Sequence, residues 1–142
     1  YPAHVILRYN IERAIIADQM TLDDLPEVWN EGMERLLGLT PPDHANGCLQ
    51  DIHWFDGAWG YFPSYSLGAM TAAQFFAAAL QADANILPAI SQGDFTPLYS
   101  WLRENIHGQG SLYETPELIK RATGKPLDAE IFKRHLQQRY LN

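Results

Sequence analysis

Apolar residues recur at helical spacing along almost the whole chain, and this pattern leaves little room for β-strands. Proline or a capping residue precedes most of the periodic segments, and glycine follows several of them, as is usual at the two ends of helices. We therefore predict an all-α fold. The predicted helices run from Pro2 onward, from Leu25 to Gly38, from Leu67 to Leu80, from Asp83 to Gln92, from Thr96 to Gly108, from Thr115 to Gly124 and from Asp128 onward.

The individual segments differ in what they predict about packing. The first is apolar around most of its circumference, so it is expected to be buried on several sides. Thr21 and Asp24 have the spacing of a capping box before the second helix, and Pro63 suits the first turn of another helix. The segment from Leu67 to Leu80 is rich in alanine, whose small side chain lets neighbouring helices approach closely, so this helix is expected to be central.

Length and charge restrict the class of protein. The 142 residues fit one domain, and we expect residues 1–142 to form a single helical region. The 10 Lys and Arg residues stand against 17 Asp and Glu residues, which gives a net charge of −7. Binding to nucleic acid or to an anionic membrane depends on clustered basic residues, so neither partner is expected.

The cysteine content suggests the compartment in which the chain works, and the first residues suggest how the chain relates to a longer protein. The single Cys48 cannot form a disulfide within the chain, which favours a reducing, cytoplasmic compartment. No run of about 18 apolar residues suggests a membrane span. The sequence begins at Tyr1 rather than at methionine, and helical periodicity starts at once. We therefore expect the chain to be a piece of a longer protein.

The residues with the most chemical potential gather between Gly47 and Tyr65, in a passage rich in glycine and aromatic residues. His53 can donate a hydrogen bond to a developing oxyanion or transfer a proton near neutral pH. The hydroxyl of Tyr61 or Tyr65 can donate a hydrogen bond while staying neutral. If Pro63 begins a helix, both tyrosines lie near its first turn and are expected to face one cleft.

A motif in this passage resembles that of a known family. Gly47, Gln50, Asp51, His53 and Trp54 match the fixed positions of GxxQDxHW in the thermostable (Taq-type) metallocarboxypeptidases. The resemblance extends over the whole chain. The opening segment is similar to the family segment that follows its IRxxAD motif, and the last forty residues are similar to the C-terminal end of the family.

The resemblance implies a fold and an activity. Family members are mostly helical, cytosolic metallopeptidases that remove single residues from peptide C-termini and are usually described as dimers. Zinc or cobalt is held by the two histidines of HExxH and a downstream glutamate. This sequence contains no HExxH, so we expect it to be the helical C-terminal lobe of a larger enzyme, to hold no metal itself, to depend on the missing N-terminal portion, and to be inactive alone.

The resemblance also implies roles for individual residues of this chain. His53 is the first candidate for hydrogen bonding to the substrate or to the transition state. Tyr61 and Tyr65 are the candidates for stabilising the oxyanion, and the sequence does not settle which one does so. Gln50 and Asp51 either fix the orientation of His53 or cap the loop.

Several other interpretations stay open at this stage. Arg8 either binds the terminal carboxylate of a peptide or pairs with Glu12, four residues further along the helix. A non-catalytic helical interaction module is the competing function. A zinc site built from His44, Cys48 and His53 is the remaining alternative, although these residues supply only three ligands from a flexible loop.

Overall fold

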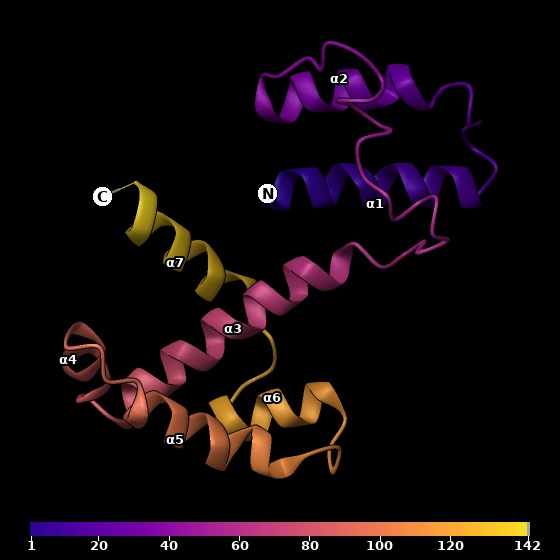
Figure 1. Cartoon of the computed structure of the whole chain (residues 1–142). Coiled ribbons are helices and arrows are strands. Elements are labelled where there is room, and N and C mark those ends of the chain that lie inside the picture. Colours follow the sequence, from indigo (N-terminus) through magenta and orange to yellow (C-terminus); the bar gives the residue numbers. More distant parts are fainter. Residues whose placement is uncertain (142) are drawn as a thin grey trace. The chain divides into compact units, whose positions relative to one another are not determined.

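The computed structural model describes residues 1–141 and confirms the all-α prediction, because no strand occurs in that part of the chain. Two compact units follow each other in sequence, residues 1–67 and the residues from 68 onward. None of the helices in the described residues combines the length and the hydropathy needed to cross a membrane. The helices, shown in Figure 1, are α1 (Pro2–Ile16), α2 (Leu25–Leu37), α3 (Pro63–Ala82), α4 (Ile86–Ser91), α5 (Thr96–Asn105), α6 (Thr115–Thr123) and α7 (Ala129–Tyr140), with a short 3₁₀ turn at His107–Gln109.

The first unit is built on α1 and α2, which lie antiparallel and side by side (Figure 1). Gly32 marks a close approach of the two helices, because a Cβ atom there would overlap the side chain of Leu7. The long connection over residues 38–62 contributes Cys48 and Trp54 to the same core. The core of this unit therefore joins two helices and an irregular loop, and the buried residues that form it are Leu7, Ile11, Leu25, Trp29, Cys48 and Trp54.

In the second unit one polar side chain connects three segments. Gln74 on α3 is 1% exposed. Its Nε2 donates to Oγ1 of Thr123 at 2.9 Å and to the carbonyl oxygen of Pro126 at 2.9 Å. Its Oε1 accepts from the backbone N–H of Asp128 at 2.8 Å. The alanine-rich helix is thus tied to the turn between α6 and α7 by a buried amide whose polar atoms are satisfied.

Most predicted helix boundaries agree with the structure. Pro63 begins α3, Gly38 and Gly124 end α2 and α6 in the left-handed conformation, and the Asp128 carboxylate caps α7 by accepting from the N–H of Glu130. Glycine is suited to both ends because their φ angles of 66° and 79° strain residues with a side chain.

Three local predictions need correction. The Thr21–Asp24 pair forms, but the backbone N–H and hydroxyl of Thr21 both donate to the Asp24 carboxylate, so Thr21 satisfies no N–H of α2. The helix from Thr96 ends at Asn105, and Gly108 lies in a separate 3₁₀ turn, packed against the carbonyl of Arg103. The helix predicted from Asp83 begins only at Ile86, after a turn in which the Asp83 carboxylate accepts from the N–H of Asn85.

Candidate functional site

A chain of hydrogen bonds links the loop after Gly47 to the first turn of α3. Asp51 Oδ1 accepts from the backbone N–H of His53 at 2.9 Å and lies 2.7 Å from its ring Nδ1. On the other side of the ring, Nε2 lies 3.0 Å from the hydroxyl of Tyr65. The three residues are close in sequence, and the helix that begins at Pro63 turns the Tyr65 side chain back toward His53. The structure therefore joins Asp51, His53 and Tyr65 in one polar unit.

The charge on Asp51 fixes which nitrogen of His53 carries the proton. Burial by itself would raise the pKa of Asp51, but the hydrogen bonds from His53 and the positive charge of Arg8 hold that pKa below its ordinary value. An ionised carboxylate can only accept, so Nδ1 of His53 must be the donor. In neutral His53 the Nε2 lone pair then accepts the proton of the Tyr65 hydroxyl.

Protonation of His53 reverses the direction of the second hydrogen bond. An imidazolium donates from both nitrogens, so its Nε2–H would donate to the oxygen of Tyr65. The single hydroxyl proton of Tyr65 is then released for another acceptor. The site thus has two hydrogen-bonding states. Only when His53 is protonated can the Tyr65 hydroxyl donate to a third group while it stays bonded to His53.

Tyr61 lies beside the same histidine but plays a different part. Its ring stacks on that of His53 with 5.8 Å between centroids, and it meets the ring of Tyr65 edge-on at 5.4 Å. In this chain Tyr61 is 52% exposed and Tyr65 is 40% exposed. Phe62 closes the inner side, with its ring 4.7 Å from that of His53. Both tyrosines therefore adjoin His53, but only the Tyr65 hydroxyl is bonded to it.

The other predicted site residue lies apart from this unit. Gln50 is exposed, and its backbone N–H donates to the carbonyl of Gly47 in a turn of the loop. Within residues 1–141, no hydrogen bond is recorded between its side chain and His53. Of the two residues expected to orient His53, Asp51 is the one in contact with it.

Two charged residues of α1 complete the site, and the sequence analysis did not assign them to it. Arg8 is fully buried, and its Nη2 lies 3.4 Å from Oδ1 of Asp51. Glu12 is 2% exposed and accepts from Nε1–H of Trp54 at 2.7 Å and from the N–H of Gly60 at 2.8 Å. The partner of Arg8 is thus Asp51 rather than Glu12. Because its guanidinium is not exposed, the structure does not support its interpretation as a ligand for a peptide carboxylate.

Comparison with known proteins identifies the family. The family model described as carboxypeptidase Taq (M32) metallopeptidase matches residues 1–140. The chain belongs to the M32 family. The recognition of the GxxQDxHW segment is thereby confirmed, and the alternative of an unrelated helical interaction module is not favoured.

Named M32 relatives are similar over the whole chain. It is 41% identical over 141 residues to thermostable carboxypeptidase 1 of Pyrococcus furiosus and 40% identical over 142 residues to carboxypeptidase 1 of Bacillus subtilis. It covers 28% of the length of each. Among solved structures, Trypanosoma cruzi metallocarboxypeptidase 1 matches with a TM-score of 0.95 and 41% identity, covering 100% of this chain and 30% of the other.

The described residues of this M32 chain do not form a site for the metal ion that a metallopeptidase requires. In residues 1–141 no three His, Cys, Asp or Glu side chains are grouped so that they could hold an ion. His44 is exposed, whereas Cys48 is buried, and that burial raises the pKa of its thiol. The alternative zinc site built from these two residues and His53 is therefore not formed.

Proposed function

We propose that this chain is the C-terminal part of an M32 metallocarboxypeptidase, which removes residues from the C-termini of peptides, and that it supplies groups that bind the substrate and its transition state. Membership of the family supports the activity. The coverage of only 28% of the curated relatives supports the view that residues 1–142 are one helical region of a longer enzyme. The observation that carries the proposal is the bonded unit of Asp51, His53 and Tyr65.

The proposed chemistry of this chain is donation of a hydrogen bond to the substrate. When His53 is protonated, its Nε2–H donates to Tyr65, and the Tyr65 hydroxyl donates to the oxyanion that develops on the scissile carbonyl. A donor already held in place costs no reorganisation when the charge develops. Tyr61 is the second candidate donor, and exposed Gln50 is a candidate contact for the peptide backbone.

The remaining parts of the proposal concern groups outside this sequence. The family resemblance assigns the metal ion, zinc or cobalt, and the general base of HExxH to the missing N-terminal portion. A homodimer and a cytoplasmic location complete the proposal, and they rest on the family resemblance and on the single cysteine.

A chimera tests the activity. This chain replaces the matching 28% of Bacillus subtilis carboxypeptidase 1, and hydrolysis of a blocked dipeptide is measured. We expect the isolated chain to be inactive and the chimera to be active. Tyr65→Phe in the chimera should lower kcat by about 10²–10³, the usual loss of one oxyanion donor. His53→Ala removes the group that holds Tyr65 and should also lower kcat. Tyr99→Phe, the same change at an exposed tyrosine of α5, is the control and should leave kcat unchanged.

Two results would contradict the proposal. Peptide hydrolysis by the isolated chain would show that the metal site is not elsewhere. Full activity of the Tyr65→Phe and His53→Ala chimeras would remove their assigned roles. The fragment assignment has its own test in the DNA upstream of the Tyr1 codon, where we expect an in-frame HExxH. A start codon immediately upstream, without that motif, would overturn it.

A further inference from the structure

A buried arginine lies between two aromatic rings behind the Asp51–His53–Tyr65 unit. Arg8 on α1 is 0% exposed. The centre of its guanidinium is 3.9 Å from the Trp54 ring centroid and 4.1 Å from that of Phe62. Guanidinium groups are planar and weakly hydrated, so they stack well in such a slot. The slot nevertheless holds a full positive charge inside the core of the first unit.

The contacts of Arg8 offset little of the free energy needed to remove its charge from water. Within the described residues its Nε, Nη1 and Nη2 atoms have no hydrogen-bond partner, and Nη2 makes only the ion pair with Asp51 at 3.4 Å. Burial lowers the pKa of Arg8, and the electrostatic interactions with Asp51, Glu12 and Tyr1 act in the opposite direction. An apolar side chain of similar length would fill the same slot without removing a charge from water. The arginine is therefore poorly explained by packing alone.

What Arg8 contacts is the oxygen that orients His53. Its Nη2 approaches Oδ1 of Asp51, and the same Oδ1 accepts from the backbone N–H and ring of His53. The ion pair joins positions 43 residues apart in sequence, whereas the bonds within the Asp51–His53 turn are local. Arg8 is thus the link that holds this turn against α1.

Glu12, one helical turn further along α1, holds the other end of the same loop. Its two carboxylate oxygens accept from Trp54 and Gly60. The segment that carries His53 is consequently fixed to one face of α1 at both ends, by a cation at one end and by an anion at the other.

We propose that Arg8 is a positioning residue of the site: its buried guanidinium holds the Asp51 carboxylate in place through the ion pair at 3.4 Å, and through Asp51 it directs the His53 ring toward Tyr65. The inference rests on the proposed function for the meaning of the site, but its first test does not depend on activity. The titratable groups around Asp51 lie at the N-terminus, on α1, in the loop and at the start of α3. They are Tyr1, His4, Arg8, Glu12, His53, Tyr61 and Tyr65.

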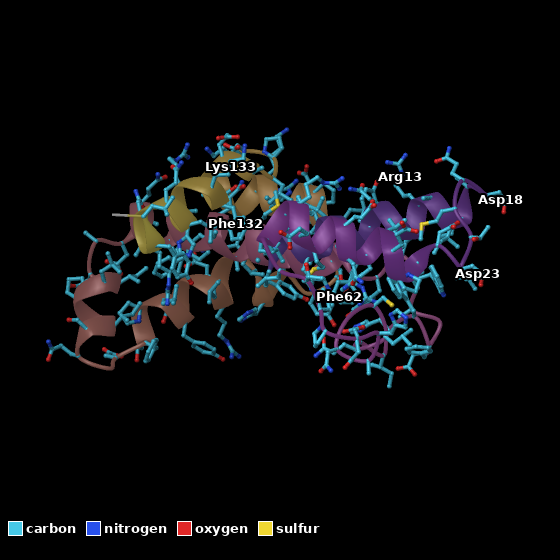
Figure 2. The ribbon with its side chains drawn as sticks, turned by 90° about the horizontal axis from the view of Figure 1, so that it is seen from above. Arg13, Asp18, Asp23, Phe62, Phe132 and Lys133 are labelled. Atoms are coloured by element: carbon cyan, nitrogen blue, oxygen red, sulfur yellow. The ribbon has the colours of Figure 1, made fainter. Side chains whose placement is uncertain are left out.

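The first test measures the ionisation of Asp51 in this chain by ¹³C NMR titration of its side-chain carboxyl. Arg8→Met keeps a side chain of similar length in the slot and removes the charge, so the pKa of Asp51 should rise. Arg8→Lys keeps the charge and should raise it less. Arg13→Met is the control, because Arg13 is exposed on the same helix, and Figure 2 shows it on the opposite side of the helix pair from Phe62.

The ranking of the two Arg8 variants separates a charge role from a filling role. If Arg8 only fills the slot, methionine should substitute for it at least as well as lysine, and Asp51 should titrate as in the wild type. That result would overturn the proposal. If the methionine variant does not fold, Arg8→Gln takes its place, because glutamine also removes the charge while keeping a polar side chain in the slot: an Asp51 pKa higher than in Arg13→Met supports the proposal, and equality with that control overturns it.

The second test uses the active chimera and reads the pH profile of kcat/KM. Since Asp51 must be ionised to hold His53, Arg8→Met should move the acidic limb to higher pH and lower kcat by about 10–100-fold, with KM nearly unchanged. An unmoved acidic limb together with an unmoved Asp51 titration would overturn the proposal. An inactive parent chimera would count against the proposed function alone, because the NMR titration does not require activity.

Discussion

Replacing Glu12 should destabilise the first unit more than any change at an exposed carboxylate. Its oxygens accept two hydrogen bonds, from Trp54 at 2.7 Å and from Gly60 at 2.8 Å, and it is 2% exposed. Glu12→Ala leaves both N–H groups without their acceptor. Leaving one buried donor unsatisfied costs about 1–3 kcal/mol, so the two together should cost about 2–6 kcal/mol. That loss is a large part of the ~5–15 kcal/mol that stabilises a typical domain.

Glu12→Gln separates the effect of the charge from that of the shape. Glutamine keeps one carbonyl oxygen as an acceptor but places an NH₂ group against the second donor, so about half of the loss in the alanine variant is expected. The charge beside Arg8 is lost in both variants. The glutamine variant should therefore lie between the wild type and Glu12→Ala in free energy of unfolding.

Urea denaturation followed by tryptophan fluorescence measures both variants. Trp29, Trp54 and Trp59 all lie in the first unit and report on its unfolding. The control is Glu31→Gln on α2, at an exposed carboxylate, which should change the free energy of unfolding by less than about 0.5 kcal/mol. A loss below about 1 kcal/mol for Glu12→Ala would refute the reasoning, because it would mean that the loop is held without these two bonds.

Two further predictions concern the second unit and the pH dependence of the first. Gln74→Met should lower the free energy of unfolding by about 1–3 kcal/mol, since it leaves the N–H of Asp128 and the carbonyl of Pro126 unpaired. Thermal unfolding followed by circular dichroism measures this loss, and a variant as stable as the wild type would contradict the prediction. Asp51 has a pKa lowered by folding, so its contribution to stability is complete above its ordinary pKa of ~3.9 and is lost as the pH falls through the lower, folded value. The difference in urea stability between the wild type and Asp51→Asn should therefore shrink below about pH 4, and a difference that is constant with pH would contradict the assignment.

The helices were predictable because their signals are local. The apolar period of α1 and α2, the prolines near helix starts and the glycines after α2 and α6 depend on residues within a turn of each other. The prediction failed where another local contact competes with the helix. Gly108 packs against the Arg103 carbonyl in a separate turn, and Asp83 forms a turn with the N–H of Asn85 instead of a helical start.

Only the part of the candidate site whose residues are close in sequence was predictable. Asp51, His53 and Tyr65 are separated by at most 14 residues, and a helix starting at Pro63 is enough to bring them together. Arg8 lies more than forty residues away, and its place behind Asp51 follows from how the loop packs on α1. A signal was present nonetheless, because Arg8 and Glu12 share the helix face of buried Val5, and charged side chains on such a face require a partner.

The two buried charges of α1 differ in what they do for the fold, and this difference bears on how the site is built. Glu12 is satisfied by two strong hydrogen bonds, so its presence is accounted for by the stability of the loop it holds. Arg8 has one ion pair at 3.4 Å and stacks between two rings, but its guanidinium nitrogens make no hydrogen bond within the described residues, and an apolar side chain would suit the same slot. A buried charged residue that lowers stability, in a slot where an apolar side chain would fit, is best explained by its effect on a neighbouring residue. That neighbour is Asp51, whose carboxylate lies 2.7 Å from Nδ1 of His53 on the side of the ring away from Tyr65.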